Sequence, residues 1–147
     1  MPFQLSTRGR YGVRLMVALA LAQDGPSLLK EVARREGISE KYLGQIIIPL
    51  KAAGLVSSQR GSRGGYSLAK PSEDITVRDV VEAIEGRIFP APGMDDAAGP
   101  ARATEVVVTG VWRIVRDEIE GSLSRITLAA LARQAREVGD STESYVI

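Results

Sequence analysis

The chain has 147 residues, of which 44% are hydrophobic and 25% charged, and its formal net charge is +1. It contains no cysteine and no histidine, which excludes disulfides, zinc fingers, thiolate nucleophiles and imidazole acid–base chemistry. No apolar run reaches the roughly 20 residues of a membrane-spanning helix, and the first residues lack a secretory leader, so we expect a cytoplasmic protein that binds no membrane.

Charge is distributed unevenly along the chain. Residues 1–70 contain 11 Lys and Arg against 4 Asp and Glu, whereas residues 71–147 contain 8 against 14. A basic module favours binding to nucleic acid, because each neutralised phosphate releases counterions. The first half is therefore the candidate for contact with nucleic acid.

A first helix is predicted to begin at Ser6 or Thr7, because either hydroxyl can cap it. Apolar residues then recur every three or four positions, and the turn-forming residues 24–26 end the helix. The apolar stripe of this helix comprises Tyr11, Leu15, Ala18, Leu19 and Ala22.

A helix-turn-helix follows. Residues 28–36 form a short amphipathic helix, and Gly37 turns the chain. Ser39 caps the second helix, 40–53, and Gly54 ends it in the left-handed conformation that a helix end favours. The apolar positions of this second helix recur at helical spacing and are Leu43, Ile46, Ile47 and Leu50.

Two strand-like runs come next, over 55–60 and 66–69, and the glycine-rich segment 61–65 joins them. Tyr66 is expected to pack beneath this hairpin and anchor it. A helix pair followed by a hairpin with cations at its tip is typical of a winged helix-turn-helix, whose usual partner is duplex DNA.

A further helix is predicted to start at Thr76 or Asp74 and to close at Gly86. It completes a DNA-binding domain over residues 1–87. Residues 88–104 are rich in proline, glycine and alanine and are predicted to form a flexible loop with little to bury.

Beyond this loop, residues 105–137 predict two helices. The first, 106–126, is long and amphipathic, the second, 127–138, is short, and residues 138–147 form a frayed tail. The sequence as a whole predicts a mainly α-helical, winged helix-turn-helix protein with a long C-terminal dimerisation helix.

The long helix carries an apolar stripe that needs a covering surface. Two-fold pairing is the commonest assembly of soluble proteins, and a dimer lets two helix-turn-helix units bind half-sites about 34 Å apart. We therefore expect a homodimer, the alternative being that the helix folds back over its own winged domain. The expected dimer contacts are Val108, Val111, Trp112, Val115, Ile119 and Leu123.

Three side chains of the recognition helix are candidates for base contacts. Lys41, Tyr42 and Gln45 are predicted on the side opposite the apolar stripe, although such residues are often solvated surface side chains. Gln can form a bidentate pair with adenine, and Lys can reach guanine acceptors or a phosphate. Arg8 and Arg10 are predicted phosphate contacts, because cations and helix N-termini favour anions.

The hairpin offers a second set of DNA contacts. Arg60 and Arg63 flank its turn together with Ser62, and Arg fits a narrow minor groove. Gly64 and Gly65 are predicted to let the turn adopt positive φ and to let the backbone approach a groove floor. The alternative is a flexible hairpin with two exposed charges.

Four short motifs, taken together, carry a resemblance to a known protein family. They are Leu5-Ser6-Thr7-Arg8-Gly9-Arg10-Tyr11-Gly12-Val13, Gly37-Ile38-Ser39 with Tyr42-Leu43 and Gln45, Pro49-Leu50-Lys51 with Gly54-Leu55-Val56, and Arg60-Gly61 with Gly64-Gly65-Tyr66 and Leu68. Between about residues 4 and 136 the chain resembles the Rrf-type family of bacterial transcription regulators, and in particular the iron–sulfur cluster regulator IscR.

The resemblance implies a homodimeric winged helix-turn-helix protein with a long dimerisation helix and a double-stranded operator as partner. It implies that Lys41, Tyr42 and Gln45 contact the major groove, and that Arg60 and the wing glycines enter the minor groove. Many IscR-like members carry a glutamate where this chain has Gly44, and that carboxylate helps to decide which operators are accepted. Gly44 lacks this repulsive carboxylate, and with it this means of selectivity by rejection.

The larger departure concerns the cofactor. Cluster-binding relatives hold a 2Fe-2S cluster through three cysteines in the loop before the long helix, because soft thiolates suit iron–sulfur clusters. The corresponding segment, Ala91 through Val106, contains none, so no cofactor and no metal ligands are expected in this sequence. Natural loss of the cluster and engineered replacement of cysteine by alanine both remain open.

Two other classes of function remain as alternatives. A winged-helix protein–protein interaction module would bind DNA weakly and without sequence preference, and the basic first half argues against it. For an enzyme, Asp95-Asp96 could bind a metal, but a lone acidic pair in a flexible segment is usually solvated. No general base or nucleophile accompanies this pair, so we expect no catalysis.

Overall fold

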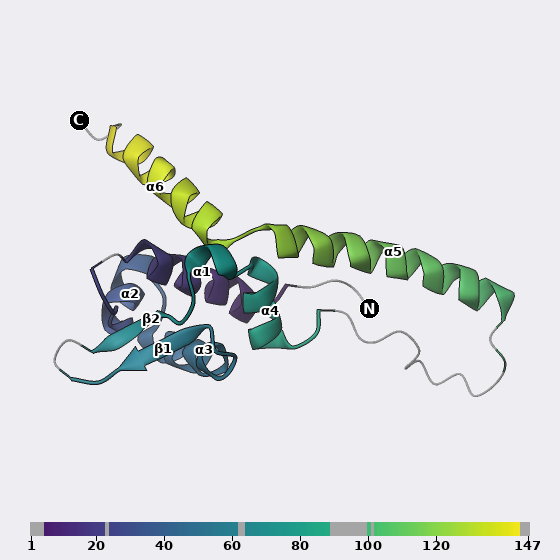
Figure 1. Ribbon diagram of the computed structural model, residues 1–147, viewed down its shortest axis with the longest axis horizontal. Helices are drawn as coiled ribbons and strands as arrows, with labels where there is room; N and C mark the ends of the chain where they lie inside the picture. The colour runs from purple at the N-terminus through teal and green to yellow at the C-terminus, as the bar shows by residue number, and fades with distance from the viewer. Residues whose placement is uncertain (1–4, 23, 62–63, 89–99, 101, 145–147) are drawn as a thin grey trace.

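The computed structural model describes residues 5–22, 24–61, 64–88, 100 and 102–144. Helices and strands of the first 85 residues gather into one domain, and two longer helices leave it (Figure 1). The predicted loop over 88–104 lies largely outside the described residues. The elements in chain order are α1 (Thr7–Leu21), α2 (Leu29–Glu36), α3 (Glu40–Ala52), β1 (Val56–Gln59), β2 (Gly65–Leu68), the 3-10 turn η1 (Ser72–Asp74), α4 (Val77–Glu85), α5 (Ala103–Arg125) and α6 (Leu128–Ser144).

The helix-turn-helix forms where its caps predict. The Ser6 hydroxyl accepts a hydrogen bond from the Gly9 N–H at 3.1 Å, and α1 begins at the next residue. Gly37 ends α2 with a φ of 66°, and Ser39 accepts from the Tyr42 N–H at 3.2 Å to start α3. These local bonds satisfy orphan donors of the first turns and so fix where each helix begins.

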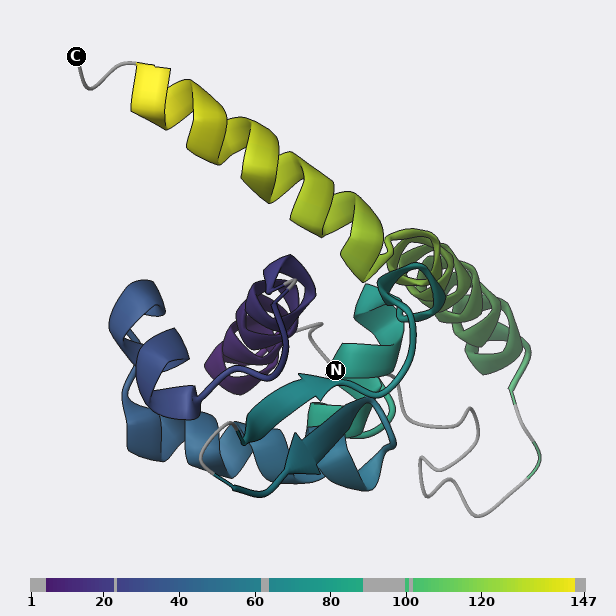
Figure 2. The same cartoon turned by 60° about the vertical axis from the view of Figure 1, so that its left-hand side comes forward.

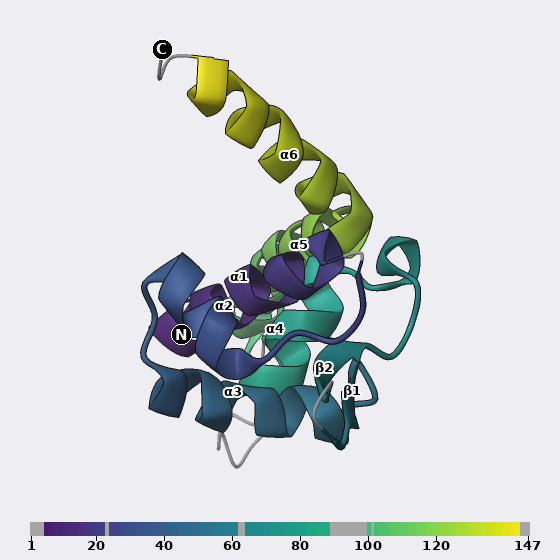
Figure 3. The same cartoon turned by 90° about the vertical axis from the view of Figure 1, so that its left-hand side faces the viewer.

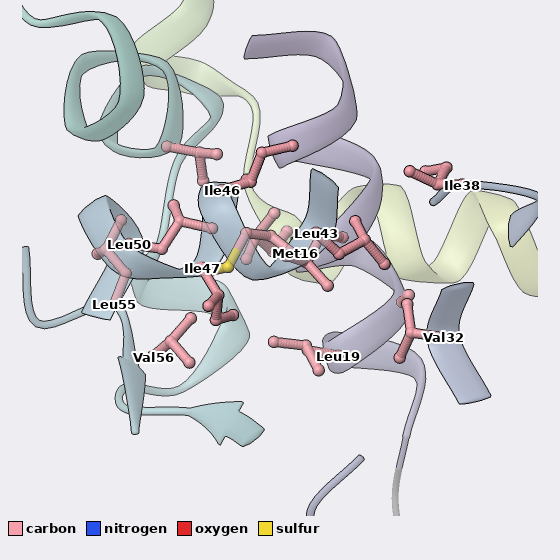
Figure 4. Close-up of a cluster of buried hydrophobic side chains, with 14 of the residues drawn as sticks. Met16, Leu19, Val32, Ile38, Leu43, Ile46, Ile47, Leu50, Leu55 and Val56 are labelled. Carbon is pink, nitrogen blue, oxygen red and sulfur yellow. The ribbon is translucent and has the colours of Figure 1, made fainter. Parts of the chain in front are cut away.

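The core lies between α1, α2 and the inner face of α3 (Figure 4). The four apolar side chains predicted for α3 are all buried, and they pack with Met16 and Leu19 from α1, Val32 from α2 and Val56 from β1. One side of α3 is thereby fixed against the domain, and its other side is left facing outward. This packing decides which residues of α3 can meet a partner.

The hairpin is an antiparallel pair of strands with Val56 opposite Leu68 and Gln59 opposite Gly65. Ser27 pairs with β2 in an isolated β-bridge, because it exchanges two backbone hydrogen bonds of 2.8 Å with Tyr66. Tyr66 is half-buried against the core, as predicted, and the wing is therefore attached to the domain at its base.

The two C-terminal helices are anchored at their junction. Thr76 caps α4 as predicted. It also forms an isolated β-bridge with Thr127, the residue between α5 and α6 that directly precedes α6. The Val77 N–H donates to the Ile126 carbonyl and the Leu128 N–H donates to the Ile75 carbonyl, both at 2.9 Å. Leu128 itself is fully buried, so the first turn of α6 belongs to the core (Figure 2).

Both C-terminal helices are longer than predicted. The long helix begins at Ala103 and not at Val106, because the Glu105 carboxylate accepts from the Arg102 N–H at 3.3 Å and so caps the helix from within. The final helix continues past Val138 to Ser144, so the prediction of a short helix with a frayed end was wrong. Gly139 lowers helix propensity by only about 1 kcal/mol relative to Ala, which does not suffice to end this helix.

Candidate nucleic-acid interface

The outward face of α3 is the centre of the candidate site. Lys41 and Gln45 are exposed on this face, opposite the four buried side chains. Figure 3 shows α3 along one edge of the domain, while α6 projects from the opposite side. Because both side chains are exposed with respect to the described part of the chain, they are available to a partner.

Tyr42 lies on the flank of α3 and not on its outermost line. Its half-buried ring meets the Tyr11 ring of α1 edge-on, with centroids 5.6 Å apart and planes at 86°. Beside the two rings is an open hollow of about 410 Å³ between the first turns of α1 and α3. The hollow is lined by Thr7, Tyr11, Gly37, Ile38, Ser39, Lys41, Tyr42 and Gln45.

Arg14 of α1 connects α1 to the end of α2 beside these rings, a role that was not predicted from the sequence. One of its guanidinium nitrogens donates to the Glu36 carbonyl at 2.7 Å and to the Glu36 carboxylate at 2.9 Å. The guanidinium also lies 5.6 Å from the centre of the Tyr11 ring, within reach of a cation–π contact. Arg14 thus connects the end of α2 to the ring that supports Tyr42.

The N-terminal end of α1 places Arg8 and Arg10 on the surface, where both side chains are exposed. The helix end itself already has an anionic partner. The Glu85 carboxylate, at the end of α4, accepts from the Ser6 N–H at 2.9 Å and also contacts the Ser6 hydroxyl. The start of α1 is therefore a poorer phosphate site than expected. The predicted phosphate contacts now depend on the side chains of Arg8 and Arg10.

The wing presents Arg60 as an exposed cation next to its turn. Positive φ occurs at Gly61 (108°) and Gly65 (145°) but not at Gly64, so the prediction of positive φ was right for Gly65 and wrong for Gly64. Gly64 is needed for another reason, because a Cβ there would collide with the carbonyl oxygens of Gln59 and Gly61. Ser62 and Arg63 lie outside the described residues.

The described residues of the chain leave the apolar stripe of α5 exposed. Val108, Val111, Trp112 and Val115 are 49%, 50%, 65% and 41% exposed, and α5 has no buried residue. The alternative of a helix folded back over its own winged domain is therefore not what the structure shows, since this part of α5 runs away from the domain (Figure 1). Ile119 and Leu123, nearer the domain, are half-buried.

The C-terminal end of α5 is held against α4 by Arg78. This side chain donates to Glu82 at 2.9 Å, forms an ion pair with Glu120 at 3.5 Å and donates to the Ser124 hydroxyl at 3.3 Å. The hydrogen bond to Glu82 and the surrounding carboxylates raise the pKa of Arg78 above its ordinary value. The ion pair with Glu120 and the hydrogen bond to Ser124 therefore link the two helices.

The described residues contain no group of three Asp or Glu side chains placed to hold a metal ion. None of the helices in the described ranges is long and apolar enough to cross a membrane. Asp95 and Asp96 lie outside those ranges, so the acidic pair noted in the sequence has no structural account.

Known proteins resemble this chain over most of its length. The chain matches the Rrf2 family, described as an iron-dependent transcriptional regulator, over residues 5–134. The HTH-type transcriptional regulator CymR of Bacillus subtilis is 38% identical over 130 residues, which cover 88% of this chain and 89% of that protein. The HTH-type transcriptional regulator IscR of Photobacterium profundum is 38% identical over 133 residues, which cover 88% of this chain and 76% of that protein.

Solved structures agree with the fold. The structure of CymR, the global cysteine regulator of B. subtilis, matches with a TM-score of 0.78 at 36% identity, covering 90% of this chain and 98% of that one. The T. potens IscR structure matches with a TM-score of 0.75 at 40% identity, covering 92% and 90%. The relatives are transcriptional regulators and not enzymes, and the winged helix-turn-helix is confirmed. On these grounds the chain belongs to the Rrf2 family of transcriptional regulators.

Proposed function

We propose that this regulator binds a roughly palindromic operator in duplex DNA as a homodimer, with α3 in the major groove and the wing in the minor groove. The observation that carries the proposal is the outward face of α3, where Lys41 and Gln45 are exposed opposite a fully buried face. Such a helix is held rigidly by its inner side while its outer side can meet base edges. A cytoplasmic location belongs to the same proposal, because a transcriptional regulator needs access to DNA.

Each proposed contact follows from the chemistry of its side chain. Gln45 pairs with adenine, Lys41 reaches guanine or a phosphate, and Tyr42 contacts the duplex from the flank of α3. In the wing, Arg60 and Arg63 enter the minor groove beside Ser62. Gly64 and Gly65 have no side chains, so the backbone can approach the groove closely. Arg8 and Arg10 fix the register of the domain through phosphates.

The homodimer is proposed to form through the exposed stripe of α5. An apolar stripe that the described residues of its own chain leave exposed is typical of a surface that a second copy buries. The division of labour that we propose is residues 1–87 for DNA binding, 88–104 as a connection and 105–137 for pairing, with α6 continuing beyond the paired region to Ser144.

A thiolate-bound iron–sulfur cluster does not fit this chain. The family description names iron, and relatives are named IscR, but the sequence offers neither cysteine nor histidine as a ligand. Soft sulfur donors are what such clusters require. We therefore propose that the chain acts without a cluster bound in that way, whether its cysteines were lost naturally or replaced by alanine.

The test is selection from a pool of randomised duplexes, followed by fluorescence-anisotropy titration at several salt concentrations. The proposal expects enrichment of a two-fold symmetric site and an affinity that falls steeply with salt. Binding that depends on salt but enriches no site would contradict sequence-specific recognition by the chain alone. Absence of binding at low salt would favour the protein-interaction module.

A further inference from the structure

Ile48 is an exposed apolar side chain on the outward face of α3, and 66% of its surface is accessible. We propose that Ile48 is a specificity-determining residue that packs on the C5-methyl group of a thymine in the major groove. This inference rests on the proposed function, since it names one base contact of the same recognition helix.

The position of Ile48 on α3 places it in the line of proposed base contacts. At about 100° per residue, positions 41, 45 and 48 fall within roughly 60° of arc on one side of the helix. Lys41 and Gln45 occupy the other two positions of that arc and are exposed as well. Ile48 is therefore presented to the same partner as the two polar side chains.

Its exposure is unusual within the winged domain. Among the described residues up to 88, the exposed large hydrophobic side chains are Leu28, at 47%, and Ile48, at 66%. The neighbouring turn of α3 adds space around Ile48, because Gly44 has no side chain and a Cβ built there would meet nothing within 4 Å. Open space therefore adjoins Ile48 on the side of Gly44.

The chemistry of the duplex supplies one matching group. Base edges in the major groove present hydrogen-bond donors and acceptors, and the thymine methyl is the apolar exception. Ile48 is the exposed large hydrophobic side chain of α3, with polar Gln45 before it and the small side chains of Ala52 and Ala53 after it. A single large apolar side chain suits one methyl group better than the larger apolar patch of a protein partner. Gln45 lies about 4.5 Å earlier along the helix, so the thymine should lie about one base-pair step from the adenine that Gln45 contacts.

The experiment replaces each thymine of the selected operator singly by deoxyuridine, which lacks only the methyl group. Affinities of the full-length wild type, Ile48→Ala and Ile48→Val are then measured by fluorescence anisotropy. For the wild type we expect a loss of roughly fourfold at one thymine of each half-site, from the burial of one methyl group. Replacing both symmetric thymines should cost roughly sixteenfold, because distant contacts add.

The variants separate this contact from other effects of the methyl on DNA. Ile48→Ala should bind the thymine and deoxyuridine operators equally at that position and keep the wild-type response at every other thymine. Ile48→Val, which retains a branched side chain, should restore part of the discrimination. Because Ile48 is exposed, circular dichroism should show unchanged folding for both variants.

Two outcomes overturn the inference and differ from each other. If Ile48→Ala shows the wild-type penalty at every deoxyuridine, the operator is recognised without a methyl contact from Ile48, and the proposed function stands. If selection enriches no operator for the wild type, the proposed function fails, and the inference fails with it.

Discussion

Lys41 and Gln45 owe their outward direction to the buried side of the same helix. Leu43 and Ile46 are fully buried, so α3 cannot rotate without exposing them to water. A recognition side chain on such a helix loses little freedom when DNA binds, which favours a specific contact over a diffuse one. The chemistry of these side chains can therefore be tested one residue at a time.

Replacing Gln45 by alanine should weaken specific binding by about 1–3 kcal/mol and relax the preference at one base position, because a bidentate pair with adenine is lost. Competition between the operator and single-base variants measures both effects. Gln134→Ala is a matched control, because Gln134 is exposed on α6, away from α3. An unchanged base preference in the Gln45 variant would remove this residue from the interface.

Replacing Arg60 by alanine should lower affinity for all DNA sequences and reduce the slope of log affinity against log salt by about 1. The reason is that the variant loses one cation that neutralises a phosphate or enters the minor groove. Titrations at four salt concentrations give that slope. Arg133→Ala removes an exposed cation from α6 and should leave the slope unchanged. A parallel loss of slope in both variants would mean that net charge alone determines binding.

The residue contacts that sequence could not predict are those between distant positions. Tyr42 was predicted to face outward with Gln45, but its ring packs on Tyr11, 31 positions earlier in the chain. Arg14 and Glu36 are likewise joined across 22 positions. Helical spacing fixes only the direction of a side chain around its own axis, and the neighbour that it meets depends on how the helices cross.

At the scale of elements, the accuracy of the predicted helix boundaries depended on the kind of cap. Ser39 and Thr76 are hydroxyl caps that precede their helices, and both starts were confirmed. The start of α5 was missed because Glu105, inside the helix, supplies the bond to the Arg102 N–H. The end of α6 was missed because the sequence after Val138 has no proline, and one glycine is a weak terminator.

The wing and the recognition helix each contain a glycine without positive φ, and the two should respond oppositely to alanine. Gly64→Ala should lower the free energy of unfolding by about 1–3 kcal/mol, because the new Cβ meets backbone carbonyls that cannot move without distorting the turn. Gly44→Ala should raise it by about 0.5–1 kcal/mol, since its Cβ enters open space on a helix. Urea denaturation measures both, and equal changes would refute the steric account.

At the scale of the whole molecule, the exposed seam of α5 predicts the oligomeric state. Trp112→Glu should convert a dimer to a monomer, because it places a charge where 65% of an indole is now accessible to a partner. Sedimentation equilibrium gives the mass, and the winged domain should remain folded. Arg113→Glu introduces the same side chain beside the stripe and should leave the dimer intact. A wild-type chain that sediments as a monomer would rule out the proposed seam.

The attachment of α5 has a consequence for how such proteins diverge. Arg78 and the Thr76–Thr127 bridge hold the helix at its C-terminal end, while the seam around Trp112 lies about two turns or more towards its other end. In the proposed dimer, α5 would set the spacing between the two half-sites, and α3 would set the base preference. A lineage can therefore change its target sequence by point substitution and keep its spacing. A one-residue insertion between Arg78's contacts and Trp112 would turn the stripe by about 100° and so change how the two winged domains of the proposed dimer are placed.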